Sequence, residues 1–207
     1  MVDIQIIPEK TALITIYFQN LFVEVHAISA PGGLDAMTRT NTLAAACRNH
    51  GIAVMHIAHQ LRSDHLNLGV LSDVVPTVES KRLLTGGETT SELHAGLDVK
   101  ESDWMVIKPR LGAFTGSDVE LTLRARGIDT LILAGIATGV CIDTTARQAA
   151  LLNFKVIMLS DSTATSVING CAAEDLQRMT LAVFVSNFGQ VASVDQMISK
   201  MEAASID

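Results

Sequence analysis

The sequence has 207 residues, of which 48% are hydrophobic, and this is enough for one compact domain with a substantial core. Its formal net charge of −7 argues against a nucleic-acid-binding protein, for which a basic face is expected. Aromatic residues make up only 4% of the chain, so the core must consist mainly of aliphatic side chains, as in a β-sheet covered by helices.

The cysteines and the first residues indicate the compartment. Cys47, Cys141 and Cys171 have no metal-binding spacing, and their odd number fits a reducing compartment better than a disulfide framework. The segment MVDIQIIPEK lacks the charged and apolar regions of a secretion signal, and no apolar run is as long as a membrane span. We therefore expect a cytoplasmic protein with neither a membrane nor a nucleic-acid partner.

Strand and helix patterns alternate over the first half of the chain. Apolar runs at 11–17 and 52–58 predict buried strands, and residues 35–49 predict a helix with Gly51 as its C-cap. The following residues, 60–102, are rich in polar side chains and glycine, so we expect loops and a short helix there. Such a long excursion from regular structure is usually functional in a compact domain.

The same alternation continues to the end of the chain. A short strand at 104–107 precedes Lys108, and residues 117–126 predict a helix that is capped by Ser117, with Glu120 at the capping-box position. Repeated βα units predict an α/β fold, a doubly wound, mainly parallel sheet with helices on both faces, in one domain over residues 1–207. The remaining predicted elements are strands at 130–134, 155–159 and 190–192 and helices at 170–183 and 194–203.

Cys141 lies in the segment LILAGIATGVCIDTTARQAALLN, where an apolar strand turns within a few residues into a helix that begins near Gly139. At a helix N-terminus, the helix dipole and free N–H groups favour a thiolate and can hold an oxyanion. This position makes Cys141 a candidate nucleophile. The alternative is a small apolar side chain that packs in the turn, as many free cysteines do.

Four reactive side chains are expected at one edge of the sheet. Tyr17, His59, Lys108 and Cys141 each follow a predicted strand, and the sites of parallel sheets lie beyond the carboxyl ends of the strands. Beside Cys141, Lys108 would lower the pKa of the thiol and could orient a carbonyl or carboxylate group, whereas alone it would be a solvated cation. His59 is either a catalytic base or a hydrogen-bonded wall residue. His56 points to the opposite face of its strand, which favours a structural role.

Three blocks of sequence carry a resemblance to a known family. They are ALITIYFQNLF at 12–22, VIKPRLGAFTGSDVELTL at 106–123 and GIATGVCIDTTARQAALLNFKVIMLSDSTAT at 135–165. In this order and at these separations, the chain resembles the isochorismatase-like cysteine hydrolases over nearly its whole length. The resemblance implies a doubly wound α/β protein that forms dimers or tetramers. It also implies hydrolysis of an amide or ureido C–N bond of a small molecule through a cysteine-bound acyl intermediate.

The resemblance also implies roles for individual residues. The nucleophile of the family corresponds to Cys141, and its catalytic lysine corresponds to Lys108. The oxyanion hole of the family would be formed here by the backbone N–H groups of Ala137 and Cys141. A cis peptide bond that is characteristic of the family would lie between Ile136 and Ala137.

A metal ion is not expected. Nicotinamidases of this family bind a metal through an Asp and several His that follow the second strand. The corresponding stretch here, HQLRSDHLNLG, offers His59, Asp64 and His65 without the matching spacing, and a mononuclear site needs at least three well-placed protein ligands. We therefore expect no metal and no other cofactor.

The first block departs from the family pattern at the position of the general acid/base. The family has an apolar strand ending in Asp, then an apolar residue and Gln-Asn-Asp-Phe, whereas this chain has YFQNLF from Tyr17 to Phe22. Both carboxylates are absent. The first of them takes the proton of the cysteine in the family and gives it to the leaving amine, and Tyr17 occupies its place.

Four explanations for Tyr17 remain open. In the first, Cys141 and Lys108 form an ion pair that needs no separate base, and the phenol, too weak a base for the thiol proton, donates a proton to the leaving nitrogen. In the second, the pocket has changed to suit an apolar or aromatic substrate, or a different bond such as an ester or thioester. In the third, the protein binds a ligand without catalysis. In the fourth, the tyrosine is an engineered replacement that traps a complex.

Further residues are predicted to surround the substrate. Leu111 and Phe114, together with Phe18, would make the pocket apolar, and Arg62 would suit a substrate carboxylate. Residues 61–102 are expected to form the pocket wall. The complete set of predicted substrate-binding residues is Gln19, His59, Gln60, Arg62, Leu111, Phe114 and Thr138.

Overall fold

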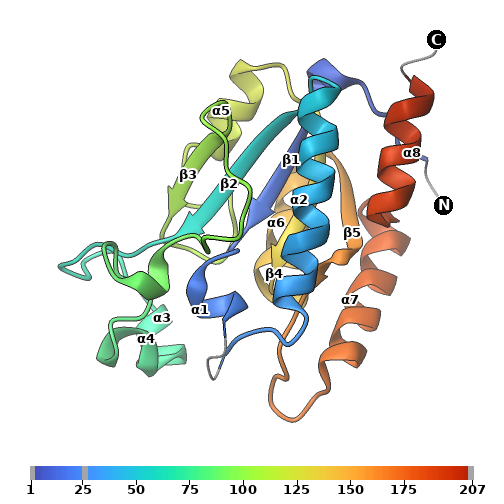
Figure 1. The fold of residues 1–207 in the computed structure, drawn as a ribbon. Helices are drawn as coiled ribbons and strands as arrows, with labels where there is room; N and C mark the ends of the chain where they lie inside the picture. Colours follow the sequence, from blue (N-terminus) through green and yellow to red (C-terminus); the bar gives the residue numbers. More distant parts are fainter. Residues whose placement is uncertain (1–2, 25–27, 205–207) are drawn as a thin grey trace.

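The computed structural model describes residues 3–24 and 28–204, which contain a parallel sheet with the strand order β3-β2-β1-β4-β5-β6 (Figure 1). From β1 the chain adds strands outward in one direction and then, after crossing to β4, in the other, which is the arrangement of a doubly wound sheet. The predicted α/β fold is therefore confirmed. The strands are β1 (Thr11–Ile16), β2 (Ala53–His59), β3 (Trp104–Lys108), β4 (Thr130–Ile136), β5 (Lys155–Ala164) and β6 (Gln190–Ala192).

Helices pack on both faces of the sheet. On one face, α2 and α8 share a core with Leu13 of β1, and on the other, α5, α6 and α7 contribute to a core that contains Ile14 (Figure 1). Successive side chains of a strand point to opposite faces, so a strand covered on both sides needs an unbroken apolar run. The helices are α1 (Asn20–Val23), α2 (Gly33–Asn49), α3 (Leu71–Val74), α4 (Pro76–Ser80), α5 (Val119–Ala125), α6 (Asp143–Leu151), α7 (Ala173–Asn187) and α8 (Val194–Ala204).

Three shorter turns complete the structure. Two are 3-10 turns, η1 (Pro8–Lys10) and η2 (Thr89–Ser91), and the third, η3 (Thr138–Ile142), is a single π-helical turn between β4 and α6. Within the described residues, we find no helix that is both long and apolar enough to cross a lipid bilayer.

The register of the strands brings their carboxyl ends together. Ile16 at the end of β1 lies opposite Gly135 of β4, and His59 at the end of β2 lies opposite Lys108 of β3. Tyr17 follows β1 directly, and its backbone N–H donates to the carbonyl of Ile57. Tyr17, His59 and Lys108 therefore lie at the same edge of the sheet, as predicted.

Two features of the predicted elements are corrected by the structure. The fifth helix begins at Val119, and Asp118, not Ser117, is its N-cap residue, with no side-chain capping bond. The hydroxyl of Ser117 instead donates to the carbonyl of Ala113, four residues earlier in the chain. The sixth helix begins at Asp143 because the preceding residues form the π-helical turn η3.

His56 has the structural surroundings that its strand position predicted. It is buried, with Nδ1 2.8 Å from the hydroxyl of Thr15 and Nε2 3.0 Å from a carboxylate oxygen of Asp103. Asp103 also accepts hydrogen bonds from Arg48, at the end of α2. The chain of contacts ties α2 to β1 and β2, on the opposite side of the strand from His59.

Candidate active site

Lys108 ends β3 and is completely buried. Its amine donates hydrogen bonds to the hydroxyl of Tyr17 and to the carbonyl of Arg110, and a third bond of 2.7 Å reaches the carbonyl of Leu111. Burial disfavours the charged form, so the pKa of Lys108 falls to about 7. Near neutral pH, therefore, a sizeable fraction of Lys108 is an uncharged amine, which keeps two N–H donors for these acceptors and has a lone pair that can accept a proton.

Tyr17 occupies the centre of the group. Its hydroxyl lies 3.0 Å from Nδ1 of His59 and 3.0 Å from the carbonyl oxygen of Arg110, to which it donates. Burial raises the pKa of Tyr17 well above that of a free phenol, so the hydroxyl keeps its proton. Tyr17 also has a φ of 61°, which is uncommon for a bulky residue, and its ring stacks on Phe22 with the centroids 5.3 Å apart.

His59 is held rigidly at the end of β2. The side-chain amide of Gln19 accepts from the backbone N–H of His59 at 2.8 Å and donates to its carbonyl at 3.0 Å. Burial, and then the charge of Lys108, lower the pKa of His59 to about 3, so the imidazole is neutral near pH 7. Its Nε2 atom is buried and has no hydrogen-bond partner among the described residues.

Cys141 lies in η3, and only 4% of its surface is exposed. Burial raises its pKa, while the charge of Lys108, the N–H of Ala137 and the hydroxyl of Tyr17 act in the opposite direction. Lys108 thus lowers the pKa of the thiol as expected, but burial outweighs this effect, so the expectation of a net thiolate-favouring site is wrong. The peptide bond between Ile136 and Ala137 is cis, as the resemblance implied.

A cavity of about 160 Å³ opens beside these groups. Tyr17, His59 and Cys141 line it on the side of the sheet, and apolar residues of α3 and α4 line it from the excursion between β2 and β3. The prediction that this excursion contributes a wall is confirmed. The residues lining the cavity are Tyr17, Phe22, Ile28, His59, Leu71, Val75, Val78, Leu84, Leu111, Ile136, Ala137, Val140, Cys141, Ser166 and Ile168.

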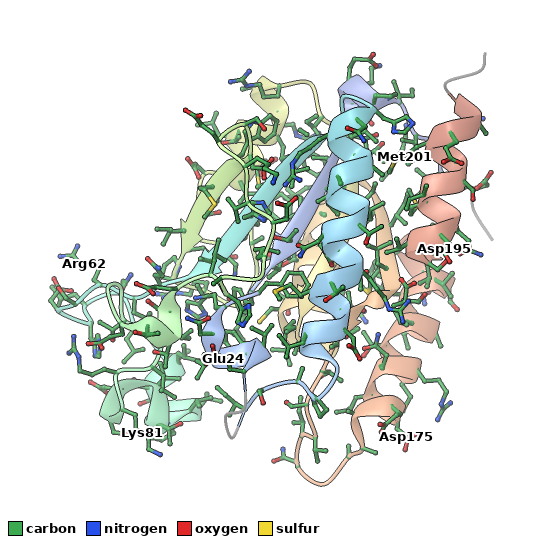
Figure 2. The ribbon with its side chains drawn as sticks, viewed as in Figure 1. Glu24, Arg62, Lys81, Asp175, Asp195 and Met201 are labelled. Carbon is green, nitrogen blue, oxygen red and sulfur yellow. The ribbon has the colours of Figure 1, made fainter. Side chains whose placement is uncertain are left out.

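Several residues that were predicted to bind substrate lie elsewhere. The guanidinium of Arg62 is exposed and pairs with Asp64, and Figure 2 shows it at the margin of the molecule. Gln60 donates to the carbonyl of Ser91, and Phe114 packs on Phe154 with ring centroids 5.7 Å apart. Each of these three side chains therefore contacts another residue of the protein and does not line the cavity.

Gln19 and Thr138 are also off the cavity lining. Both are completely buried, and the amide of Gln19 is occupied by backbone groups of His59 and Ser91. The hydroxyl of Thr138 has no hydrogen-bond partner among the described residues. Of the predicted substrate-binding residues, the structure brings His59 and Leu111 to the cavity.

The apolar residues of α3 and α4 that line the cavity were not predicted individually from the sequence. Leu71, Val75 and Val78 are spaced four and three residues apart, which is the spacing of one helical face. That pattern was the available signal, although the helix is interrupted at Val75 and α4 begins at Pro76. No group of three His, Cys, Asp or Glu suited to a metal ion occurs in the described part of the chain.

Comparison with known proteins gives consistent matches along the chain. The model of the isochorismatase domain family matches residues 11–196. A ureidoacrylate amidohydrolase of Variovorax paradoxus is 29% identical over 212 residues, covering 94% of this chain and 82% of that protein. The fold is similar to that of a cysteine hydrolase from Pseudomonas syringae, with a TM-score of 0.92, 31% identity and coverage of 98% and 97% of the two chains. An isochorismatase family protein from Burkholderia thailandensis has a TM-score of 0.82 at 30% identity, with 96% and 98% covered.

Proposed function

The chain belongs to the isochorismatase family, and from that premise we propose that it hydrolyses a C–N bond, other than a peptide bond, in a small molecule. The similarity to an amidohydrolase and to a cysteine hydrolase supports an amide or ureido group as the reacting group. One observation carries the proposal. The buried thiol of Cys141 interacts electrostatically with the buried amine of Lys108, whose pKa is lowered.

In the first half of the proposed reaction, the amine of Lys108 takes the proton of Cys141. The thiolate sulfur then attacks the carbonyl carbon, and a C–S bond forms as the carbonyl electrons move onto oxygen. The N–H groups of Ala137 and Cys141 would hold this oxyanion. The N–H of Ala137 already acts on the sulfur in the resting site, which supports its place in the oxyanion hole.

In the second half, the leaving nitrogen must gain a proton as the C–N bond breaks. The hydroxyl of Tyr17 accepts a hydrogen bond from Lys108 and also interacts with the thiol of Cys141, so it lies between the two. We propose that the proton passes from the ammonium of Lys108 through this hydroxyl to the leaving nitrogen. Water then hydrolyses the thioester and restores the thiol.

A second candidate function is supported by the same tyrosine. The absence of a carboxylate at position 17 and the apolar cavity fit a binding protein, or an enzyme that cleaves an ester or thioester, whose leaving group needs less protonation. These alternatives differ in what becomes attached to Cys141. An ester hydrolase forms the same acyl adduct from different substrates, whereas a binding protein forms none.

The test is a panel of small amides, ureides, esters and thioesters, with turnover and the intact mass of the protein measured for each. We expect the native protein to form an acyl adduct and to turn over an amide or ureide. Cys141→Ala should show neither the adduct nor the turnover. The variant Cys171→Ala is the matched control, because Cys171 is an exposed cysteine that is not among the residues lining the cavity. Saturable ligand binding without turnover or adduct would favour the binding protein.

The resemblance also supports two broader proposals. We propose that the protein acts as a homo-oligomer, a dimer or tetramer, and that it works in the cytoplasm. Light scattering coupled to size-exclusion chromatography measures the first, and a mass equal to a single chain of 22.1 kDa would contradict it. Fractionation of the source cells checks the second.

A further inference from the structure

We propose that the substrate of this site is a small, uncharged amide or ureide whose non-reacting part is a branched alkyl group or a single aromatic ring. The inference rests on the proposed function, because it specifies the substrate of the same cavity. Three properties of that cavity carry it, namely its size, the chemistry of its wall and the position of the nearby cations.

The size of the cavity limits the non-reacting part of the substrate. An apolar cavity of roughly 150 Å³ holds a benzene ring. The cavity beside Cys141 has about 160 Å³, so a six-membered ring or a branched chain of four to five carbons fills it. A nucleotide, which combines a base, a sugar and a phosphate, is too large for this volume.

The wall opposite the reacting groups is apolar. Leu71, Val75, Val78 and Leu84 approach from one side, and Ile168 approaches from the loop after β5. Tyr17, His59 and Cys141 supply polar groups at the sheet edge, and Ser166 adds one from the loop after β5. One of them, Nε2 of the buried His59, has no protein partner among the described residues, which leaves it available for the amide group of a substrate. The cavity thus has a polar end for the amide and an apolar end for its substituent.

Among the described residues, the cations near the site have other partners. Lys108 is completely buried, with its amine directed to Tyr17 and two backbone carbonyls. Arg110 donates to the carbonyls of Asn67 and Pro109, and the exposed Arg62 is paired with Asp64. None of the three is on the lining of this cavity, although Arg110 lines a neighbouring pocket that shares Leu71 and Leu111 with it. A carboxylate in the cavity would therefore lose hydration without gaining an ion pair, which is unfavourable.

Two amides of almost the same shape test the inference by turnover. Isovaleramide and malonamate differ in having an isopropyl group or a carboxylate at the same distance from the amide. We expect kcat/KM to be at least 100-fold higher for isovaleramide. Equal values, or a preference for malonamate, would overturn the inference and indicate that Arg110 or Lys108 reaches the substrate. Failure of Cys141-dependent turnover on the whole panel would contradict the proposed function instead.

A second measurement addresses the cavity independently of turnover. Iodoacetamide and iodoacetate alkylate the same thiol but differ in charge, and the exposed Cys171 supplies an internal reference within the same chain. We expect the ratio of the neutral to the anionic alkylation rate to be at least tenfold higher at Cys141 than at Cys171. Equal ratios, or a preference of Cys141 for iodoacetate, would contradict an apolar cavity that excludes anions.

A substitution at the mouth links the selectivity to the cavity itself. Leu111 lines the cavity and is 40% exposed, so an arginine there can reach inward without being buried. We expect Leu111→Arg to lower the iodoacetamide preference of Cys141 by at least tenfold. Leu121→Arg adds the same charge at a remote site that is 72% exposed and should leave the preference unchanged. An unchanged preference in Leu111→Arg would show that the selectivity does not arise from this cavity.

Discussion

The amine of Lys108 donates a hydrogen bond to the hydroxyl of Tyr17 and lies 4.2 Å from the centroid of the same ring. Burial lowers the pKa of the amine to about 7 and raises the pKa of the phenol, so burial drives both groups toward their neutral forms. An aspartate at this position would be an anion and would favour the ammonium. The tyrosine therefore leaves an amine able to act as a base near neutral pH.

The first prediction concerns the pH dependence of alkylation at Cys141. The rate with iodoacetamide should rise as the pH passes through about 7, because loss of one proton from the coupled pair of thiol and amine creates the first reactive thiolate. In Lys108→Met the thiol titrates without the amine, and its pKa is raised by burial. The inflection should then move above pH 9. Peptide mass spectrometry over pH 5.5 to 10 measures both profiles, and coincident curves would contradict the pairing.

The second prediction separates the hydroxyl of Tyr17 from its ring. Tyr17→Phe keeps the stacking on Phe22 and removes the contacts with Lys108 and His59. We expect kcat to fall by roughly 100-fold or more, the usual size of a general acid effect, while Cys141 remains open to alkylation. Steady-state kinetics on the best amide measures the loss.

Esters provide the matched control for the Tyr17→Phe variant. An activated ester leaves with little need for a proton, so its hydrolysis by Tyr17→Phe should fall much less than that of the amide. A parallel loss on both substrates would assign Tyr17 to packing or positioning. Unchanged amide turnover would exclude the hydroxyl from the reaction.

The third prediction is a stability difference that depends on pH. The pKa of Lys108 is about 7 in the folded protein and 10.5 for a lysine in the unfolded chain, so the folded state binds fewer protons between these two values. Stability contributed through this group therefore rises with pH from about 7 to 10.5 and is lowest below 7. Lys108→Met removes the cost of burying the cation, but it also removes the hydrogen bonds that Lys108 donates to the carbonyls of Arg110 and Leu111, a loss that does not vary with pH. The stability of the variant relative to the native protein should therefore be about 2 to 4 kcal/mol higher at pH 6.5 than at pH 9.5.

Urea unfolding at a series of pH values measures this difference. The exposed Lys155 offers a matched control in Lys155→Met, because its amine is solvated and its loss should give no comparable trend. A difference between Lys108→Met and the native protein that stays constant with pH would contradict the lowered pKa of Lys108.

The fold and the four reactive residues followed from the sequence because each depended on short segments. Apolar runs marked the strands, and parallel strands end at a common edge, so Tyr17, His59, Lys108 and Cys141 had to converge. The raised pKa of Cys141 depended instead on burial by residues distant in the sequence. Arg62 was assigned to the pocket by charge type alone, whereas its neighbour Asp64 pairs with it at the surface.

The cavity wall was harder to predict for a related reason. Leu71 belongs to α3 and Val78 to α4, helices of four and five residues that are too short for periodicity to stand out among the polar residues around them. Their position over Cys141 arises from tertiary packing against the sheet edge. Chain order alone located the wall within residues 61–102 but could not identify its members.

The fourth prediction tests the close approach of β1 and β4 beneath the site. Gly135 has a φ of 131°, and a Cβ atom there would lie 1.9 Å from the carbonyl oxygen of Ile16. Gly135→Ala should therefore cost roughly 3 kcal/mol or more in the free energy of unfolding, or prevent folding, because the two strands cannot separate without breaking their ladder. Gly32→Ala is the matched control, since its nearest neighbour would be 3.9 Å away, and it should change stability by less than about 1 kcal/mol. Urea unfolding of both variants measures the difference, and equal stabilities would mean that β1 and β4 lie farther apart at Gly135 than this structure places them.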